Sequence, residues 1–298
     1  MGLHPHDFRK GRNEEMNAIE MRDVSKAYRD FALSHVSLTL PSGGIMGLIG
    51  ENGAGKSTTI NLIMNAVERD SGRITVLGSD NRDKGFSKIR EDIGVVLDEA
   101  YFPEVLNARQ VNSIMKYTFK RWDEVIYFDY IRKFDLPKNK MFKEYSRGMK
   151  MKLAIAVALS HSPKLLILDE ATSGLDPIVR DEILEIFNDF TRDETHSVLL
   201  SSHITSDLEK ICDYIAFIHK GSLIFSEEKD RLLEGYGIVH LSRDDFSALP
   251  SEIILGYKDL GYSVDALVKR KEIPSRFPVD RARIEEIMLF LVKGGSRA

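Results

Sequence analysis

Two short segments of the chain contain residues suited to binding and cleaving a nucleotide. Residues 50–57 read Gly-Glu-Asn-Gly-Ala-Gly-Lys-Ser and match the pattern G-x-x-x-x-G-K-S/T. Backbone N–H groups of such a loop surround a polyphosphate, the lysine reaches the outer phosphates, and the following hydroxyl binds Mg²⁺. Residues 165–170 form an apolar strand that ends in Asp169 and Glu170. Together the two segments predict hydrolysis of a nucleoside triphosphate with magnesium.

Each residue of these segments has a predicted role. The predicted phosphate-binding residues are Gly50, Asn52, Gly53, Ala54, Gly55, Lys56, Ser57 and Thr58. The glycines let the backbone approach phosphates at a helix N-terminus, where the helix dipole favours anions. We expect Ser57 and, through a water, Asp169 to hold Mg²⁺, and Glu170 to act as the general base. The alternative for the two carboxylates is a solvated strand end, which the four apolar residues before them disfavour.

Three later segments add polar groups that narrow the prediction. Residues 145–149, Tyr-Ser-Arg-Gly-Met, precede a predicted helix and place Ser146 and Gly148 at its N-terminus as a second anion site. Residues 173–176 read Ser-Gly-Leu-Asp and follow the carboxylates directly. His203 ends the next strand. A lone histidine is usually a surface or core residue, but at this edge of a sheet that carries phosphate motifs, a contact with the terminal phosphate is favoured.

The elements that must position these groups follow from the hydrophobic pattern. The pattern predicts antiparallel strands within 17–40, a buried strand at 45–49, and a helix over 56–67 after the glycine loop. Strands at 93–97, 165–168, 198–201, 214–219 and 223–226 and helices over 149–161, 177–192 and 205–211 are also predicted. This alternation predicts an α/β fold with a mostly parallel sheet. The aromatic-rich segment 106–142 is predicted to be mostly helical, with its rings in the core.

The two ends of the chain differ from this central part. After residue 228 we expect a small α+β accessory region, with strands at 239–241 and 262–268, a helix near 250–260 and a last helix over 279–292. This region contains no chemical motif, and its expected role is packing or support of a dimer. Residues 1–15 are polar and are expected to be a flexible extension or a tag. The main domain is therefore predicted to span 16–227.

Composition limits the class of protein. The 298 residues, with 43% hydrophobic content, allow one large domain or two modest ones. A net charge of −4 gives no footprint for a polyanion, so we expect no nucleic-acid partner. The single cysteine, Cys212, cannot form an internal disulfide and fits a reducing compartment. No apolar run approaches the ~18 residues that a membrane helix needs.

In their order and spacing, these motifs resemble those of the ATP-binding subunits of ABC transporters. The resemblance covers about residues 17–225. It implies a P-loop ATPase core with an antiparallel N-terminal part and a helical subdomain at about 98–160. It also implies that Tyr28 stacks on adenine and that His203 holds the terminal phosphate. In the family, two subunits enclose each ATP, which implies that Ser146 and Gly148 reach the partner's ATP and that Asp176 lies at the dimer seam.

Two segments depart from the family pattern. Most members have a glutamine after the strand at 93–97, whereas this chain has Asp98 and then Glu99. A carboxylate can ligate Mg²⁺, so Asp98 is a candidate metal ligand. In the segment 145–149, Arg147 replaces a usual glycine and Met149 a usual glutamine. Arg147 either reaches the partner's phosphates or points into solvent.

The resemblance leads to a functional hypothesis with two alternatives. We expect an ATPase that forms a homodimer or heterodimer around ATP and drives a separate transmembrane subunit, docked through segment 98–145. Such a chain would be cytoplasmic and peripheral on the inner face of the membrane. Its layout is similar to that of bacterial exporters of peptides or antibiotics. A soluble ATPase acting on ribosomes or DNA is disfavoured by the single cassette, and a regulator without turnover is disfavoured by the retained Glu170.

Overall fold

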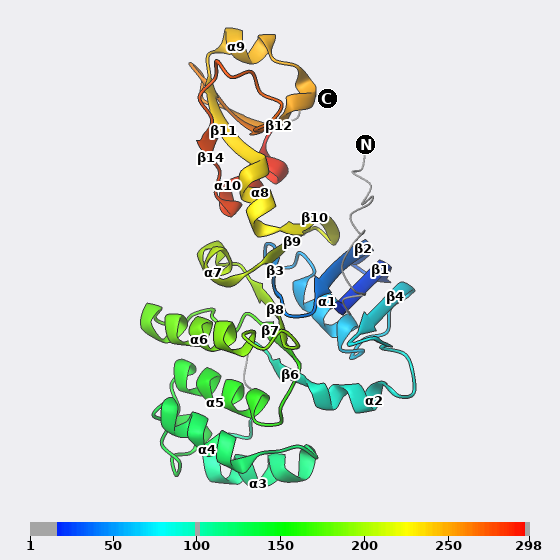
Figure 1. Ribbon diagram of the computed structural model, residues 1–298, viewed down its shortest axis with the longest axis vertical. Coiled ribbons are helices and arrows are strands. Elements are labelled where there is room, and N and C mark those ends of the chain that lie inside the picture. The colour runs from blue at the N-terminus through cyan, green and yellow to red at the C-terminus, as the bar shows by residue number, and fades with distance from the viewer. Residues whose placement is uncertain (1–16, 99–101, 296–298) are drawn as a thin grey trace.

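The computed structural model describes residues 17–98 and 102–295 (Figure 1). The predicted extension 1–15 and Glu99 lie outside the described residues. The strands are β1 (Asn17–Ala27), β2 (Ala32–Pro41), β3 (Ile45–Ile49), β4 (Ser71–Val76), β5 (Ser79–Asp80), β6 (Ile93–Val96), β7 (Leu165–Asp169), β8 (Ser197–Ser202), β9 (Tyr214–His219), β10 (Ser222–Glu228), β11 (Tyr236–Leu241), β12 (Ile254–Asp259), β13 (Val264–Lys269) and β14 (Asp280–Arg281). The helices are α1 (Lys56–Ile63), α2 (Phe86–Ile89), α3 (Ala108–Thr118), α4 (Glu124–Lys133), α5 (Arg147–Leu159), α6 (Pro177–Phe190), α7 (Thr205–Ile211), α8 (Lys229–Gly235), α9 (Arg243–Ala248) and α10 (Ile284–Lys293).

One large sheet holds ten strands in the order β5-β4-β1-β2-β10-β9-β3-β8-β7-β6. From β9 to β6 each strand is parallel to its neighbour. Every residue of β3 and of β7 is buried, as expected for strands that are covered on both faces. The predicted α/β fold with a parallel core is confirmed.

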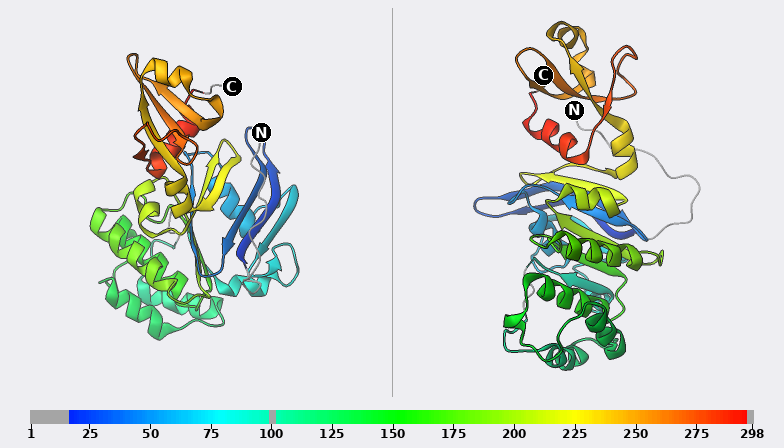
Figure 2. Two further views of the ribbon diagram at one scale, coloured as in Figure 1. Left: turned by 45° about the horizontal axis from the view of Figure 1, so that its top comes forward. Right: turned by 90° about the vertical axis from the view of Figure 1, so that its left-hand side faces the viewer.

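The N-terminal part of the same sheet is antiparallel. Strand β1 pairs in antiparallel fashion with both β2 and β4, and β4 continues to the short β5. In the left view of Figure 2 these strands, in blue and cyan, lie at the side of the molecule opposite the green helices. The antiparallel N-terminal part is therefore confirmed, although the sequence had not predicted β4 and β5.

Helices α3, α4 and α5 form the end of the molecule opposite the C-terminal region (Figures 1 and 2). Tyr127 is fully buried between them, and its hydroxyl donates to the Ala108 carbonyl at 2.8 Å. The Trp122 indole donates to the Asn112 side chain at 2.8 Å. Most of the aromatic side chains of this segment therefore pack in the core as predicted, but Tyr117 is 92% exposed.

The C-terminal region has its own antiparallel sheet, in the order β12-β13-β11-β14, with α10 packed on one face. The predicted α+β character is confirmed. The predicted helix near 250–260 is wrong, because residues 251–253 form a single 3₁₀ turn and 254–259 form β12. Ile254 and Gly256 alternate as buried residues in β12, and its register with β13 supplies the hydrogen bonds that a helix would otherwise make internally.

Three predicted helix boundaries shift for local reasons. Helix α1 ends at Ile63 rather than 67, and Asn65 then adopts a left-handed φ of 51°. Helix α5 begins at Arg147, because the Ser146 hydroxyl caps it. Helix α10 begins at Ile284, because the residues of β14 pair with β11 instead. None of the helices in the described part of the chain combines the length and apolar character that crossing a bilayer requires.

Candidate active site

The glycine-rich loop joins β3 to α1 and folds its lysine back onto its own backbone. Gly53 and Gly55 have φ values of 79° and 116°, which residues with a Cβ rarely adopt. Lys56 is buried, and its Nζ donates to the Gly50 carbonyl at 2.9 Å. Glycine at these two positions therefore lets the loop adopt left-handed turns.

The other predicted residues of the loop differ in their exposure to solvent. Ala54 is buried, Thr58 is half-buried, and Asn52 and Ser57 are exposed. Ser57 lies in the first turn of α1, where backbone N–H groups lack partners within the helix. An anion at this position would meet N–H groups, a hydroxyl and the lysine from one short segment.

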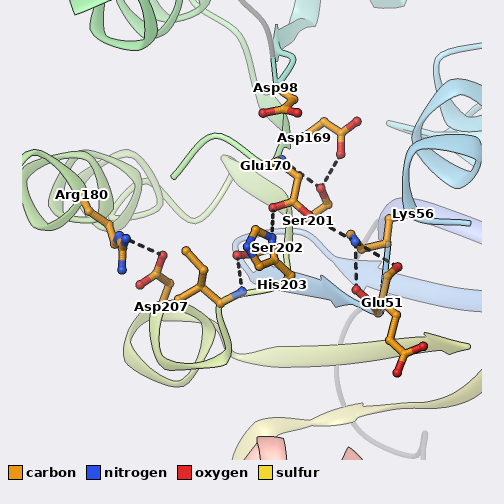
Figure 3. A network of polar contacts seen from close by, with 12 residues as sticks. Glu51, Lys56, Asp98, Asp169, Glu170, Arg180, Ser201, Ser202, His203 and Asp207 are labelled. Carbon is orange, nitrogen blue, oxygen red and sulfur yellow. Dashed lines mark hydrogen bonds and ion pairs between the residues drawn. The ribbon is translucent and has the colours of Figure 1, made fainter. Parts of the chain in front are cut away.

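Glu170 lies between Lys56 and His203 (Figure 3). One carboxylate oxygen, Oε1, is 3.2 Å from Lys56 Nζ, and the other, Oε2, is 2.7 Å from His203 Nδ1. The Glu170 side chain is only 12% exposed, so both contacts are partly shielded from water and strengthened. The structure thus brings together three residues that sequence reasoning predicted from separate segments.

The backbone of Glu170 is held in an unusual conformation. Its φ is 52°, in the left-handed region that few residues other than glycine occupy. The Glu170 N–H donates to the Ser201 carbonyl at 3.1 Å, which ties it to β8. Such conformations persist only where surrounding contacts enforce them, and they cluster at functional sites.

A serine that sequence reasoning gave no role connects the Asp169 carboxylate to the backbone of Glu170. The Ser201 hydroxyl donates to Asp169 Oδ1 at 2.5 Å and accepts from the Glu170 N–H at 3.1 Å. Ser201 is fully buried and Asp169 nearly so, and a charge-assisted hydrogen bond there fixes the orientation of the carboxylate. Its position on β8, directly opposite Asp169 on β7, was the signal that could have identified it.

The strand order explains why these groups meet. Strands β3, β8, β7 and β6 are parallel neighbours, so the segments that follow them lie along one edge of the sheet. Ligands of open α/β sheets bind at this edge. The register pairs Val96 with Leu168, and Asp98, two residues further on, lies at the same edge as Asp169 and Glu170 (Figure 3).

Asp98 and Arg147, two of the residues that depart from the family pattern, lie together. Arg147 Nη2 donates to Asp98 Oδ1 at 3.1 Å, and both side chains are about half exposed. The sequence left open whether Arg147 reaches a partner's phosphates or points into solvent. In this chain it forms an ion pair with Asp98.

The remaining polar candidates lie at two neighbouring helix starts. Ser146 caps α5 by accepting from the Met149 N–H at 3.2 Å, and Asp176 caps α6 by accepting from the Val179 N–H at 3.1 Å. A Cβ placed on Gly148 would lie 3.5 Å from the Val179 side chain, so the first turns of α5 and α6 pack together. Ser146 and Asp176 are both exposed.

Tyr28 follows β1 and offers an exposed ring near the loop. Tyr28 is 46% exposed, and its ring centroid lies 6.5 Å from that of Phe31 and 5.7 Å from Lys26 Nζ. Phe31 in turn packs against Gly55, where an added Cβ would lie 3.0 Å from its ring. A flat base could therefore stack on Tyr28 while phosphates reach the loop.

Oxygen donors suited to Mg²⁺ come from Ser57 and Asp169. Mg²⁺ is usually held by one or two protein oxygens together with substrate phosphates and water. Asp169 is buried at the end of β7, with one carboxylate oxygen fixed by Ser201. Among residues 17–98 and 102–295 no group of three or more His, Cys, Asp or Glu side chains could hold a metal ion. The hydroxyl and the carboxylate fit an ion that also binds phosphate.

A second buried carboxylate lies behind His203. Asp207 on α7 is 4% exposed, and burial raises its pKa. Arg180 Nε on α6 lies 3.9 Å from Asp207 Oδ2 and opposes this shift (Figure 3). Sequence reasoning did not single out Asp207. Asp207 and Arg180 thus place opposite charges across the contact between α7 and α6.

Comparisons with known proteins identify the family of the chain. Residues 33–173 match the family model described as ABC transporter. The chain is 35% identical over 215 residues to a lantibiotic transport ATP-binding protein, SrtF, of Streptococcus pyogenes, covering 71% of this chain and 91% of that protein. It is 30% identical over 283 residues to a linearmycin resistance ATP-binding protein, LnrL, of Bacillus subtilis, covering 92% and 89%.

Solved structures give the same result for the fold. A structure of the ATP-binding subunit of an ABC transporter has a TM-score of 0.65 at 28% identity and covers 72% of this chain and 91% of its own. A dimer of the ATP-binding cassette MJ0796 in a post-hydrolysis state, bound to ADP and Pi, has a TM-score of 0.63 at 21% identity and covers 70% and 98%. At that identity the second likeness shows the fold alone. The chain belongs to the ABC transporter family, as one of its ATP-binding and ATP-hydrolysing subunits.

Proposed function

We propose that Glu170 is the general base that activates water when this chain hydrolyses ATP. The observation that carries the proposal is the Glu170 carboxylate, 3.2 Å from Lys56 Nζ and 2.7 Å from His203 Nδ1. A carboxylate beside the phosphate-binding lysine is placed to accept a proton from an attacking water. His203 contacts the same Glu170 carboxylate as Lys56 does, and it also contacts the terminal phosphate of ATP. The loop 50–57 binds the phosphates. ATP phosphates then compete with Glu170 for Lys56.

Ser57 and Asp169 are the residues that would hold Mg²⁺. The ion supplies positive charge that neutralises the phosphates. Asp169 takes part through its carboxylate, which Ser201 orients from behind. Ser57 takes part through its exposed hydroxyl at the start of α1.

Two copies of the chain are proposed to enclose two ATP molecules. Each copy has both a phosphate loop with Glu170 and a helix start formed by Ser146, Arg147 and Gly148, of which Ser146 and Arg147 are exposed. One copy would supply the loop and the other the helix start, so a homodimer would complete two sites. Asp176, exposed at the neighbouring start of α6, would lie at the seam. Tyr28 would stack on the adenine of its own chain's ATP.

The proposed cargo is a peptide or antibiotic, and the name of SrtF, a lantibiotic transport ATP-binding protein, supports it. We further propose that the chain drives export through a separate membrane subunit, at the inner face of the membrane. We assign the ATPase domain to 16–227, its helical part to about 98–160, and the accessory region to 228–298. The membrane subunit would dock on segment 98–145, which exposes several large apolar side chains: Val105, Ile114, Tyr117, Val125 and Met141.

The rate of phosphate release tests the role of Glu170. Glu170→Gln keeps the size of the side chain but removes the proton acceptor, so we expect the rate to fall by about 10²–10⁴-fold while ATP still binds. Glu272→Gln is the matched control, because Glu272 is an exposed glutamate paired with Lys269 at 3.2 Å in the accessory region. A wild-type rate in Glu170→Gln would exclude Glu170 as the base.

Co-purification from detergent-solubilised membranes tests the membrane partner. The tagged chain is expected to recover a multi-span membrane protein, and Tyr117→Ser is expected to reduce its yield without changing phosphate release. Tyr262→Ser is the control, because Tyr262 is 86% exposed in the accessory region. Recovery of ribosomes or DNA instead would support the alternative class of soluble ATPase.

A further inference from the structure

Arg147 joins two segments that are far apart in the sequence. Asp98 lies two residues beyond the end of β6, and Arg147 is the first residue of α5. Their ion pair, Nη2 to Oδ1 at 3.1 Å, therefore links one sheet edge of the ATP site to the start of the helix that is proposed to face the partner. Arg147 and Asp98 carry opposite charges, and both are positions where this chain departs from the family pattern.

Arg147 also packs on a third segment, the Ser-Gly-Leu-Asp stretch after β7. A Cβ placed on Gly174 would lie 2.7 Å from Nη1 and 2.9 Å from Cζ of Arg147. The guanidinium thus lies directly over the Gly174 backbone, which has a left-handed φ of 66°. The Arg147 guanidinium, at the start of α5, is therefore positioned by Asp98 after β6 and by Gly174 after β7, within its own chain.

The ion pair between Arg147 and Asp98 is weak enough for a phosphate group to replace Asp98. Both side chains are more than half exposed, at 55% and 54%, and exposed pairs contribute only about 0.2–1 kcal/mol. A guanidinium has five N–H donors. Among the described residues, the Arg147 guanidinium donates one hydrogen bond, to Asp98. Phosphate groups bind such a fork in bidentate fashion and carry more charge than one carboxylate.

We propose that Asp98 and Arg147 form an autoinhibitory contact, in which Asp98 holds Arg147 until the terminal phosphate of the partner's ATP displaces it. This inference rests on the proposed ATP-bound dimer, and it adds a contact within each chain that regulates formation of that dimer. It assigns Asp98 the role of a counter-ion to Arg147 rather than that of a metal ligand. Pairing of two chains then requires enough ATP to compete with Asp98.

Opposite effects of two substitutions test the proposal. In the Glu170→Gln background, which preserves bound ATP, the mass of the protein is measured by light scattering while MgATP is titrated. Asp98→Asn releases Arg147, so we expect dimerisation at about two- to fivefold lower ATP concentration. Arg147→Gln removes the phosphate ligand, so we expect dimerisation at a higher ATP concentration. With both substitutions, the effect of Asp98→Asn is expected to disappear.

A merely structural role for the pair would give a different pattern. Both single variants would then shift the ATP midpoint in the same direction, or leave it unchanged, and either result would overturn the proposal. Asp129→Asn is the matched control, because it breaks an exposed aspartate–arginine pair with Arg132 on α4, 2.5 Å long, and should leave the midpoint unchanged. If the parent Glu170→Gln protein never dimerises with ATP, the proposed function fails instead.

Discussion

Ser201 offers a sharp test of how the site is held together, because its neighbour Ser202 is a natural control. Both side chains are fully buried on β8. The Ser201 hydroxyl donates to the Asp169 carboxylate at 2.5 Å, whereas the Ser202 hydroxyl accepts from the backbone N–H of Ile204 at 2.9 Å. Replacing either serine with alanine removes one buried hydroxyl. Ser201→Ala loses the bond to the Asp169 carboxylate and the bond from the Glu170 N–H, which keeps the Ser201 carbonyl as an acceptor, whereas Ser202→Ala loses one bond to a neutral group. The main difference between the two changes is therefore the charged partner of Ser201.

The expected costs follow from that difference. A hydrogen bond to a charged group contributes about 1.5–3 kcal/mol, and a neutral one about 0.5–1.5 kcal/mol. Ser201→Ala should therefore lower the free energy of unfolding by about 2 kcal/mol, and Ser202→Ala by about 1 kcal/mol. Urea denaturation measures both values, since a change in stability moves the midpoint at an unchanged slope.

A functional readout separates orientation from stability. Ser201 fixes Asp169, and loss of a partner that orients a metal ligand typically costs 10–100-fold in metal affinity. We expect Ser201→Ala to raise by about that factor the Mg²⁺ concentration that half-saturates phosphate release, while Ser202→Ala changes it by less than about twofold. If the two variants lose equal stability and share one Mg²⁺ midpoint, the Ser201 contact does not orient Asp169 and this reasoning is refuted.

Three further predictions concern individual side chains. His203→Ala removes the 2.7 Å contact with Glu170 and should slow phosphate release by about a hundredfold with ATP binding retained; an unchanged rate would exclude His203 from the site. Tyr28→Ala should weaken ATP binding by about fivefold or more, measured by nucleotide fluorescence, whereas Tyr28→Phe keeps the ring and the affinity; equal affinities for both variants would exclude stacking. Burial lowers the pKa of His161, which is 1% exposed. Because the folded state favours the neutral ring, stability should fall as pH drops through about 6.5 and on toward the lower pKa of the folded state. His161→Phe should flatten that pH dependence in urea denaturation at pH 7.5 and 5.5, and an identical slope in both proteins would show that His161 does not cause it.

The convergence of Lys56, Glu170 and His203 could be predicted from the sequence, because parallel strands bring the segments after them to one edge of a sheet. The strands themselves were readable as short apolar runs between turn signals. The polar groups that follow them therefore had a predictable neighbourhood. Their mutual contacts, 3.2 Å and 2.7 Å at Glu170, required the structure.

Other contacts depend on packing that local patterns do not encode. Arg147 and Asp98 are 49 residues apart, and their ion pair depends on the packing of α5 against β6. Strand β12 was mistaken for a helix, because a short apolar stretch followed by lysine and aspartate fits either period. Its pairing with β13, a tertiary contact, decides between them. Ser201 was overlooked because a serine at a strand end has no distinctive pattern.

The most direct test of the central claim is the mass of the Glu170→Gln chain in solution. Light scattering on the purified protein, with MgATP and without nucleotide, compares the two conditions in one experiment. Two chains that enclose ATP between them should have twice the mass of one chain with MgATP, and the mass of one chain without nucleotide. A protein that binds MgATP but keeps the mass of one chain at every ATP concentration would contradict the claim.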